Sequence, residues 1–204
     1  MVNDATTEAS LTLPRVLGLD ISTSVTGMTV LDAPYVGMHS PNVVVMTHVE
    51  LARIDGFWAK VDEFKRVLYQ LTLTAKFHGI THVFVEESLQ AFRPGLSSAT
   101  TLMTLAKFNG VVSSIVRDEL GHTPVPLSAT SARKTCGIRV SRDAHGPDGK
   151  KLGAKQQTFL QMTGPGGFLA GHEFPTKRGG APKDWAYDEV DSAVIAWAGL
   201  RSLS

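Results

Sequence analysis

The sequence contains a single cysteine, Cys136, and no long apolar run among its 204 residues. One cysteine excludes an internal disulfide, and no group of cysteine and histidine residues has the spacing of a zinc site. A membrane-spanning helix needs roughly 20 consecutive apolar residues, and no segment approaches that length. The chain also begins with a polar, acidic stretch where a secretory signal would be basic and then apolar. We therefore expect an intracellular protein with no membrane partner.

A strong net charge is absent as well. The formal net charge is +1, and 43% of the residues are hydrophobic. The chain can therefore bury a core and form one domain of ordinary size, and its total charge does not by itself indicate a nucleic-acid partner. We expect a disordered tail over residues 1–13 and a single domain over residues 14–204.

The basic residues are nevertheless distributed unevenly. Between residues 133 and 155, seven basic residues stand against two acids; the seven are Arg133, Lys134, Arg139, Arg142, Lys150, Lys151 and Lys155. A second basic cluster consists of Lys177, Arg178 and Lys183. Such clusters fit a solvated surface and a surface that follows DNA phosphates equally well, so charge alone does not decide between the two.

Hydrophobic periodicity predicts an α/β domain. Strands are expected over residues 15–20, 25–31, 42–51, 81–86 and 123–127, and helices over 58–77, 97–120, 128–136, 151–162 and 187–200. This order fits a mixed five-stranded sheet with helices on both faces. Residues 137–149 are expected to be mobile, and the Gly- and Pro-rich residues 163–182 to be either functional or disordered. In the first helix, Trp58 shares its predicted buried face with Phe64 and Leu68.

Four acidic residues stand in three separate contexts. Asp20 and Glu86 each end an apolar strand, and Asp188 and Asp191 stand three residues apart in the last helix. Carboxylates at the ends of buried strands lose hydration, and a hard divalent cation is the usual compensation. The i, i+3 spacing places the two helical acids on one face. If all four converge, they can hold the two Mg²⁺ ions that hydrolyse a phosphodiester, which predicts a metal-dependent nuclease.

Taken singly, each acid also fits a structural role. Asp188 and Asp191 fit an N-terminal cap or an exposed charge near a helix start. Glu86 has an acidic neighbour, Glu87, and only one of two adjacent residues at a strand end points into a site. The set is more specific than any member, because four independent acids must converge.

Several segments, in chain order, resemble motifs of the RuvC family of Holliday-junction resolvases. Residues 16–30 resemble the first motif, an apolar strand ending in Asp20, a small polar turn, the pair Thr26-Gly27 and a second strand. The other matching segments are residues 83–87, with Glu86 as the metal ligand; the long helix around 102–112; residues 151–162, with Lys155; and the closing motif Asp188-Glu189-Val190-Asp191-Ser192-Ala193. The matches cover nearly all of the chain after the predicted tail.

This resemblance implies an RNase H-like fold, a homodimer, and paired symmetric nicks in four-way DNA junctions. It also implies dependence on two Mg²⁺ ions, or on Mn²⁺, held by Asp20, Glu86, Asp188 and Asp191. Lys155 would then lie near the scissile phosphate. For contacts to DNA, we expect the basic residues Lys134, Arg139, Arg142 and Lys151.

The chain departs from the family pattern in two loops. The loop after Glu86 is longer than usual in bacterial members, and we place the aromatic residue that probes the junction centre at Phe92, beside Arg93 as a further DNA contact. The segment formed by residues 163–185 is also much longer than in the family pattern. These departures indicate a divergent member, of bacteriophage or organelle type.

Two other functions fit parts of the same pattern. Residues 18–27 also resemble the phosphate-binding hairpin of sugar kinases and other actin-like ATPases, but those proteins need a duplicated domain, for which this chain has no room. A non-catalytic nucleic-acid-binding domain of the same fold is the other alternative. The presence of all four acids argues against it.

Overall fold

The computed structural model describes residues 13–34, 40–87, 99–146 and 149–203. The strands are β1 (Arg15–Asp20), β2 (Val25–Asp32), β3 (Asn42–Glu50), β4 (His82–Glu86) and β5 (Val125–Leu127). The helices are α1 (Phe57–Thr72), the short 3-10 helix η1 (Ala75–Phe77), α2 (Ala99–Leu120), α3 (Ala129–Thr135), α4 (Ala154–Thr163) and α5 (Asp184–Arg201). No helix among the described residues is long and apolar enough to cross a membrane.

All five strands form one mixed sheet in the order β3-β2-β1-β4-β5. The first three strands are antiparallel neighbours, whereas β4 runs parallel to β1 and β5 parallel to β4. Leu19 pairs with Val85 across the β1–β4 boundary, so the carboxyl ends of the two strands meet at one edge of the sheet. This arrangement confirms the predicted five-stranded α/β sheet and places Asp20 and Glu86 on neighbouring strands.

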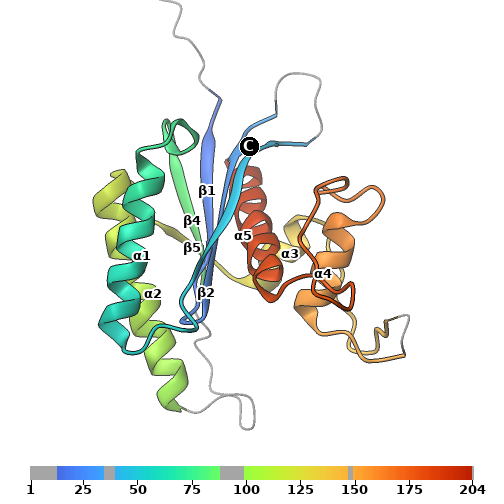
Figure 1. Ribbon diagram of the computed structural model, residues 1–204. Coiled ribbons are helices and arrows are strands. Elements are labelled where there is room, and N and C mark those ends of the chain that lie inside the picture. Colours follow the sequence, from blue (N-terminus) through green and yellow to red (C-terminus); the bar gives the residue numbers. More distant parts are fainter. Residues whose placement is uncertain (1–12, 35–39, 88–98, 147–148, 204) are drawn as a thin grey trace, which may run out of the picture.

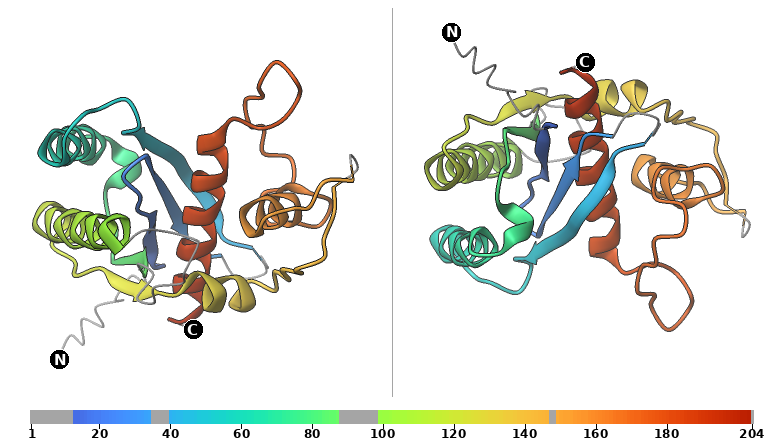
Figure 2. Two further views of the ribbon diagram at one scale, coloured as in Figure 1. Left: turned by 90° about the horizontal axis from the view of Figure 1, so that it is seen from below. Right: turned by 90° about the horizontal axis from the view of Figure 1, so that it is seen from above.

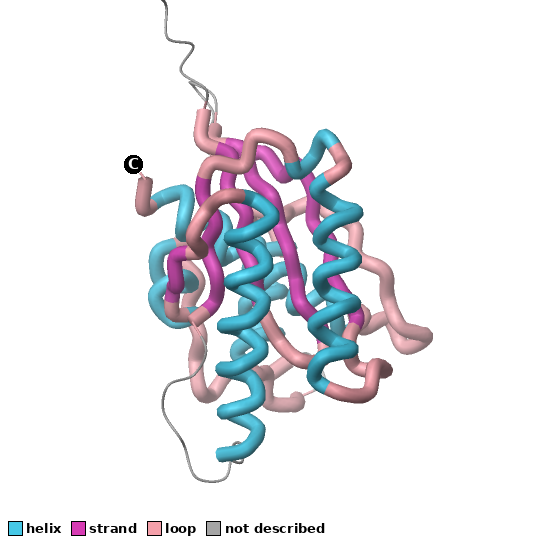
Figure 3. Tube along the Cα trace, turned by 90° about the vertical axis from the view of Figure 1, so that its left-hand side faces the viewer, coloured by secondary structure: helices cyan, strands magenta, loops and turns pink. Residues whose placement is uncertain are grey.

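Helices cover both faces of the sheet. Figure 1 shows α1 and α2 on one face and α5 on the other, with α3 and α4 packed outside α5. In Figure 3, α1 and α2 lie side by side in front of the strands. The core is accordingly divided in two: Phe64, Leu68 and Phe108 belong to the half under α1 and α2, whereas Ile195 and Met162 belong to the half around α5.

Helix α5 lies very close to the sheet because glycines face it. A Cβ atom added to Gly27 of β2 would overlap the Asp188 carbonyl group, and one added to Gly18 of β1 would overlap the Ser192 carbonyl oxygen. The hydroxyl of Thr29 lies 2.7 Å from that of Ser192, so a buried hydrogen bond adds to the contact between β2 and α5. The backbone of α5 is therefore held against β1 and β2 at the segment that carries the last two acids.

Several helix boundaries differ from the sequence-based expectation. The helix predicted over 58–77 is interrupted, because Thr74 has an extended conformation and separates α1 from η1. Helix α4 starts at Ala154, where the Gln156 side chain accepts a hydrogen bond from the Gly153 N–H at 2.8 Å. Helix α5 starts at Asp184, earlier than expected, since its polar first turn gives no apolar signal.

Trp58 corrects one prediction about the core. Its side chain was expected on the buried face of α1, but 67% of it is exposed. Helix α1 begins at Phe57, so Trp58 lies in the first turn. There its ring packs edge-on against Phe57 with the ring centroids 5.2 Å apart. The buried residues of α1 are Val61, Phe64 and Leu68.

The Gly- and Pro-rich stretch after α4 packs on the body of the molecule. Leu169 is 2% exposed and belongs to the core around α5. The Phe174 ring lies 5.1 Å from that of Phe159 on α4. Before α4, the main-chain N–H of Ser141 donates to the Gln157 side chain at 2.8 Å. Both long loops thus have specific contacts with α4.

Candidate active site

The four predicted acids come from three elements that meet at one end of the sheet. Asp20 is the last residue of β1 and Glu86 the last residue of β4. Asp188 and Asp191 lie on α5, which the close contact at Gly27 holds against β2. Asp20 and Asp191 are buried, with 5% and 2% exposure, whereas Glu86 is half-buried.

Lys155, from the first turn of α4, lies among these carboxylates. Its Nζ atom is 2.9 Å from Oδ2 of Asp20, 2.6 Å from Oδ1 of Asp188 and 3.4 Å from Oδ2 of Asp191. The structure therefore brings together residues separated by up to 171 positions in the chain, from Asp20 to Asp191. The spatial grouping agrees with the site proposed from the sequence.

Arg133 is a further member of the cluster that the sequence analysis did not select. Its Nη2 atom donates a hydrogen bond to Oδ1 of Asp191 at 3.1 Å, and its side chain is 15% exposed. A signal for this position was present in the sequence. Arg133 shares the i, i+3, i+4, i+7 spacing with Ala129, Ala132 and Cys136, so it lies on the inward face of α3.

The carboxyl groups are difficult to ionise at this site. Burial raises the pKa of Asp20 to about 6, although the nearby Lys155 ammonium opposes the shift. Burial, together with the charges of Asp20 and Asp191, raises the pKa of Glu86 to about 8. The pKa of Asp188 is also raised by burial, against the effect of Lys155. For these three groups, desolvation outweighs the available positive charge.

The Lys155 ammonium responds in the opposite sense. Burial disfavours its charged form, but the carboxylates of Asp20, Asp191 and Asp188 outweigh that effect and raise the pKa of Lys155. Lys155 is therefore a cation at every physiological pH. With Arg133 it supplies two positive charges near four carboxyl groups, which leaves the cluster short of positive charge.

The carboxylate oxygens of the four acids are suitable ligands for a hard divalent cation. Oδ2 of Asp191 is buried and accepts no hydrogen bond, although Lys155 lies within ion-pair distance. An orphaned carboxylate oxygen beside acids with raised pKa values is the kind of donor that Mg²⁺ prefers. Within the described residues, however, no three His, Cys, Asp or Glu side chains are already arranged to hold a metal ion. The Lys155 ammonium lies in the space between the carboxylates.

The predicted DNA contacts have mixed outcomes. The side chains of Lys134, Arg139, Arg142 and Lys151 are all exposed. They lie in or near the segment that joins α3 to α4, before Lys155. Phe92 and Arg93 lie outside the described residues. The exposed basic side chains are accessible to a ligand, and their role in DNA binding stays a prediction.

A second interaction supports α5 from behind the site. The Glu189 side chain is 8% exposed, and its Oε1 atom lies 2.7 Å from Nδ1 of His48 on β3. The His48 ring stacks on Trp185 with the centroids 4.2 Å apart. Glu189 is part of the closing motif, but its partner could not be identified from the sequence, because His48 is distant in the chain and no local pattern marks it.

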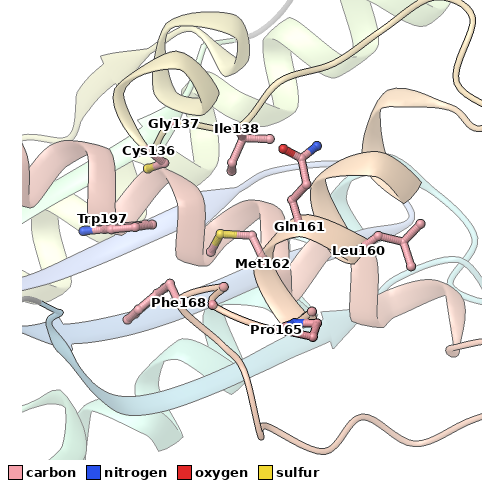
Figure 4. A pocket seen from close by; sticks show the side chains of 12 residues that line it. Cys136, Gly137, Ile138, Leu160, Gln161, Met162, Pro165, Phe168 and Trp197 are labelled. Atoms are coloured by element: carbon pink, nitrogen blue, oxygen red, sulfur yellow. The ribbon is translucent and has the colours of Figure 1, made fainter.

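A separate cavity of about 430 Å³ lies away from the acids, between the second half of α4 and the later part of α5. Figure 4 shows Met162, Phe168 and Trp197 around it, with Cys136 at its rim. Burial raises the pKa of the Cys136 thiol to about 12, so the sulfur is protonated and a poor nucleophile. In this environment Cys136 behaves as a small apolar residue.

Solved structures of Holliday-junction resolvases are similar to this chain. RuvC from Thermus thermophilus matches with 16% identity and a TM-score of 0.59, covering 93% of this chain and 95% of that one. T. thermophilus RuvC in complex with a Holliday junction substrate matches with 12% identity and a TM-score of 0.59 over the same shares. The yeast mitochondrial Holliday junction resolvase matches with 15% identity and a TM-score of 0.51, over 93% of this chain and 78% of that one.

No family model matches the chain, and no curated protein matches it. At these low identities the structural similarity establishes the fold. It confirms the RNase H-like architecture that the motif resemblance implied, with a sequence that has diverged widely from the solved resolvases.

Proposed function

We propose that the protein is a metal-dependent endonuclease that resolves four-way DNA junctions by paired, symmetric nicks. One observation carries the proposal: Asp20, Asp188 and Asp191 surround Lys155 at the end of β1, with Glu86 at the end of the adjacent strand. The fold is shared with resolvases, one of them solved with a Holliday junction substrate. The support comes from site and fold together, since one fold can host many functions.

The four acids are the proposed ligands of Mg²⁺, with Mn²⁺ as a substitute. When bound, two such ions would supply an activated water and stabilise the leaving 3′ oxygen. Two observations support this assignment: the cluster is short of positive charge, and Oδ2 of Asp191 accepts no hydrogen bond from Lys155 or Arg133. Arg133 would hold the Asp191 carboxylate in a fixed orientation through its hydrogen bond to Oδ1.

Lys155 is proposed to act on the phosphate. Its side chain is 46% exposed, so the ammonium can reach a backbone that approaches from solvent. In the free protein it is bonded to Asp20 and Asp188. When a phosphodiester enters, the ammonium would turn from these carboxylates to the phosphate oxygens and stabilise charge as it develops there. Its raised pKa keeps it protonated for that task.

Paired nicks require two sites, and we propose a homodimer through α2. This helix presents to solvent a surface that includes Met103, which is 62% exposed, and Gly110, where no atom of the described residues lies within 4 Å of an added Cβ. The two residues lie on one face of α2, about two turns apart, and a large exposed apolar side chain together with a small residue on one face suits a close helix contact. A two-fold dimer would match the two-fold symmetry of a four-way junction.

A substrate panel tests the proposed function. The protein is incubated with a synthetic four-way junction, a replication fork and linear duplex, each with Mg²⁺ or with EDTA. We expect Mg²⁺-dependent nicks at symmetric positions in the junction and little cleavage of duplex. Binding of the junction without cleavage would instead support the non-catalytic alternative. Cleavage of all three DNAs at equal rates would remove the junction preference and leave a general nuclease.

A further inference from the structure

The basic cluster near the end of the chain forms a defined turn, which we call the basic turn (residues 176–183). Thr176 and Pro182 pair as an isolated antiparallel bridge. The N–H of Lys177 donates to the carbonyl of Ala181 at 2.7 Å, and the N–H of Gly180 donates to the carbonyl of Lys177 at 2.9 Å. Gly180 has a φ of +81°, a conformation that glycine adopts without strain. The turn thus holds its own shape.

The basic turn is fixed to the helix that carries two of the proposed metal ligands. Lys177 Nζ donates to Oδ1 of Asp184, the first residue of α5, at 2.6 Å. The N–H of Lys183 donates to the carbonyl of Pro175 at 3.1 Å. Asp188 follows Asp184 by about one helical turn. The basic turn is therefore tied to the start of α5, about one helical turn before Asp188.

The turn lies at the site's end of the sheet but toward a different edge from the other basic segment. Lys177 and Lys183 share a hollow of about 380 Å³ with Val25 and Glu50, which pair at the ends of β2 and β3. Strand β3 forms one edge of the sheet, and the basic turn lies near it. Strand β5 forms the opposite edge and leads into α3 and the other basic segment. In both views of Figure 2, the loop before α5 stands out from the body of the molecule, apart from residues 139–146 and 149–152.

Two cations of the basic turn are available to an external ligand. Glu50 and Asp184 also line the hollow, and Asp184 is already bonded to Lys177. Arg178 and Lys183 are exposed, and their side chains make no hydrogen bond or ion pair with the described part of the chain. The turn therefore offers a guanidinium and an ammonium to solvent without an internal partner.

We infer that the basic turn binds the phosphate backbone of a duplex arm of the branched DNA, as a second contact surface in addition to the one predicted for Lys134, Arg139, Arg142 and Lys151. This inference rests on the proposed function. The carboxylates of the site repel a phosphate backbone, so cations must offset that repulsion where DNA approaches. Helices α4 and α5 both bring residues to the site, and a basic segment precedes each of them. With the segments apart, their cations can contact different arms.

The test compares two double variants of equal charge change. Arg178→Ala/Lys183→Ala removes the available cations of the basic turn, and Lys65→Ala/Lys76→Ala removes two exposed lysines at α1 and η1, on the other face of the sheet. Affinity for a four-way junction and for linear duplex is measured against salt concentration, in EDTA and in the Asp20→Asn background, so that the DNA stays intact. Circular dichroism melting checks that each variant folds.

We expect the basic-turn variant to bind the junction roughly tenfold more weakly near 0.1 M salt, with the slope of log K against log salt reduced in magnitude by about 1.8 for two lost phosphate contacts. The control variant should bind like the parent. Neutral methylphosphonates are placed in one pair of symmetry-related arms at a time, because a two-fold dimer presents two copies of the turn. They should weaken binding by the parent most in one pair and weaken the basic-turn variant no further there. That pair contains the arms that the turn contacts.

The outcomes separate this inference from the proposed function. A basic-turn variant with the affinity and slope of the parent would overturn the inference, even if the parent prefers the junction. If the parent binds linear duplex and the junction with equal affinity, the proposed preference for four-way junctions is wrong. A loss of affinity in the basic-turn variant would still support phosphate binding by the turn. A parent that binds no DNA would overturn both.

Discussion

The two faces of the sheet are covered in different ways. On the α1 and α2 face, large side chains such as Phe64, Leu68 and Phe108 fill the space between helix and strand. On the α5 face, Gly18 and Gly27 let the helix backbone touch the strands directly. A contact through long side chains tolerates small shifts by repacking, whereas a contact between backbones does not.

This difference coincides with the location of the candidate site. Asp188 lies where α5 touches Gly27, and Asp191 lies close to the Gly18 contact at Ser192. The carboxylates on α5 are thereby held at a fixed position relative to Asp20 on β1. The α1 and α2 face contributes no residue to the described acid cluster. Positional accuracy is thus concentrated on the face where the proposed chemistry needs it.

The largest expected effect that distinguishes the two faces of the sheet is that of Asp20→Asn. Its control is Asp62→Asn, on the exposed side of α1. The first change removes a proposed metal ligand, and the loss of several kcal/mol of charge stabilisation should lower the cleavage rate roughly 10³-fold or more. Junction binding should be largely retained, because affinity comes mainly from phosphate contacts with cations. Asp62→Asn should leave both unchanged. Single-turnover cleavage and binding assays measure the two effects.

Full Mg²⁺-dependent cleavage by Asp20→Asn would remove the ligand assignment. The neighbouring acids offer a second comparison, since Glu86→Gln should impair cleavage more than Glu87→Gln. The reverse order would show that Glu87 is the residue that points into the site.

Gly27→Ala should have the next largest effect. The added methyl group would overlap backbone atoms of Asp188, which cannot move without shifting α5. We expect a loss of about 3 kcal/mol or more in the free energy of unfolding, at the upper end of the range for overpacking, together with a loss of activity. Urea unfolding measures the change. The matched control is Gly110→Ala on α2, and a similar loss there would contradict the contrast between the two faces.

Much of this architecture was predictable from the sequence, and the reasons differ between residues. The apolar runs that end in Asp20 and Glu86 correctly predicted strands β1 and β4, because a buried strand has a strong local pattern of apolar residues. Asp188 and Asp191 were selected because their spacing places them on one helix face and because their segment resembles the closing motif of the resolvases. Trp58 was wrongly predicted to be buried. Helical periodicity shows which residues share a face, but it does not show whether another element packs on that face at the first turn.

Contacts between distant segments were not predictable in the same way. Arg133 was counted only as part of a basic run, although it is the partner of Asp191. The pair of His48 and Glu189 joins β3 to α5, and neither residue carries a local signal for the other. Such pairs depend on the sheet order and on the approach of α5, which only the folded chain establishes.

Lys155→Ala should lower the rate of the chemical step by about 10²-fold, the usual loss when one charge-stabilising group is removed. Binding should change much less, because a single cation contributes one phosphate contact among many. Lys134→Ala should show the opposite balance, with weaker binding and a nearly unchanged single-turnover rate at saturating protein. Equal effects on rate and affinity in both variants would show that Lys155 has no special position.

The raised pKa values predict a pH dependence of stability in the metal-free protein. Asp20 and Glu86 have folded pKa values of about 6 and about 8, above their ordinary values of 3.8 and 4.5. Between the ordinary and raised values the folded state binds more protons than the unfolded state, so stability is present at low pH and is lost as pH rises from about 4 to about 8. The melting temperature should therefore fall across this range, by about 2–4 °C for each kcal/mol lost.

Two additions sharpen this measurement. Mg²⁺ should raise the melting temperature more at pH 8 than at pH 5, because metal binds the ionised carboxylates. Glu86→Gln should flatten the dependence at its upper end. On the opposite face, the hydrogen bond from Arg66 lowers the pKa of the half-buried Glu63, and Glu63→Gln should leave the decline unchanged. A melting temperature that is constant from pH 5 to pH 8 would contradict the raised pKa values of Asp20 and Glu86.

The smallest expected effect is that of Gly110→Ala, and it tests what covers α2. Within the described part of the chain nothing lies within 4 Å of the added methyl group, and alanine favours a helix over glycine by up to about 1 kcal/mol. The monomer should therefore become slightly more stable. If α2 forms the proposed dimer interface, the methyl group meets the partner helix, and a loss of about 1 kcal/mol would raise the dimer dissociation constant roughly fivefold. Analytical ultracentrifugation and melting at several protein concentrations separate the two effects. An unchanged dimer dissociation constant would mean that the interface lies on another surface. Helix α2 would then make no close backbone contact at Gly110, in contrast to α5, whose backbone touches the sheet at Gly18 and Gly27.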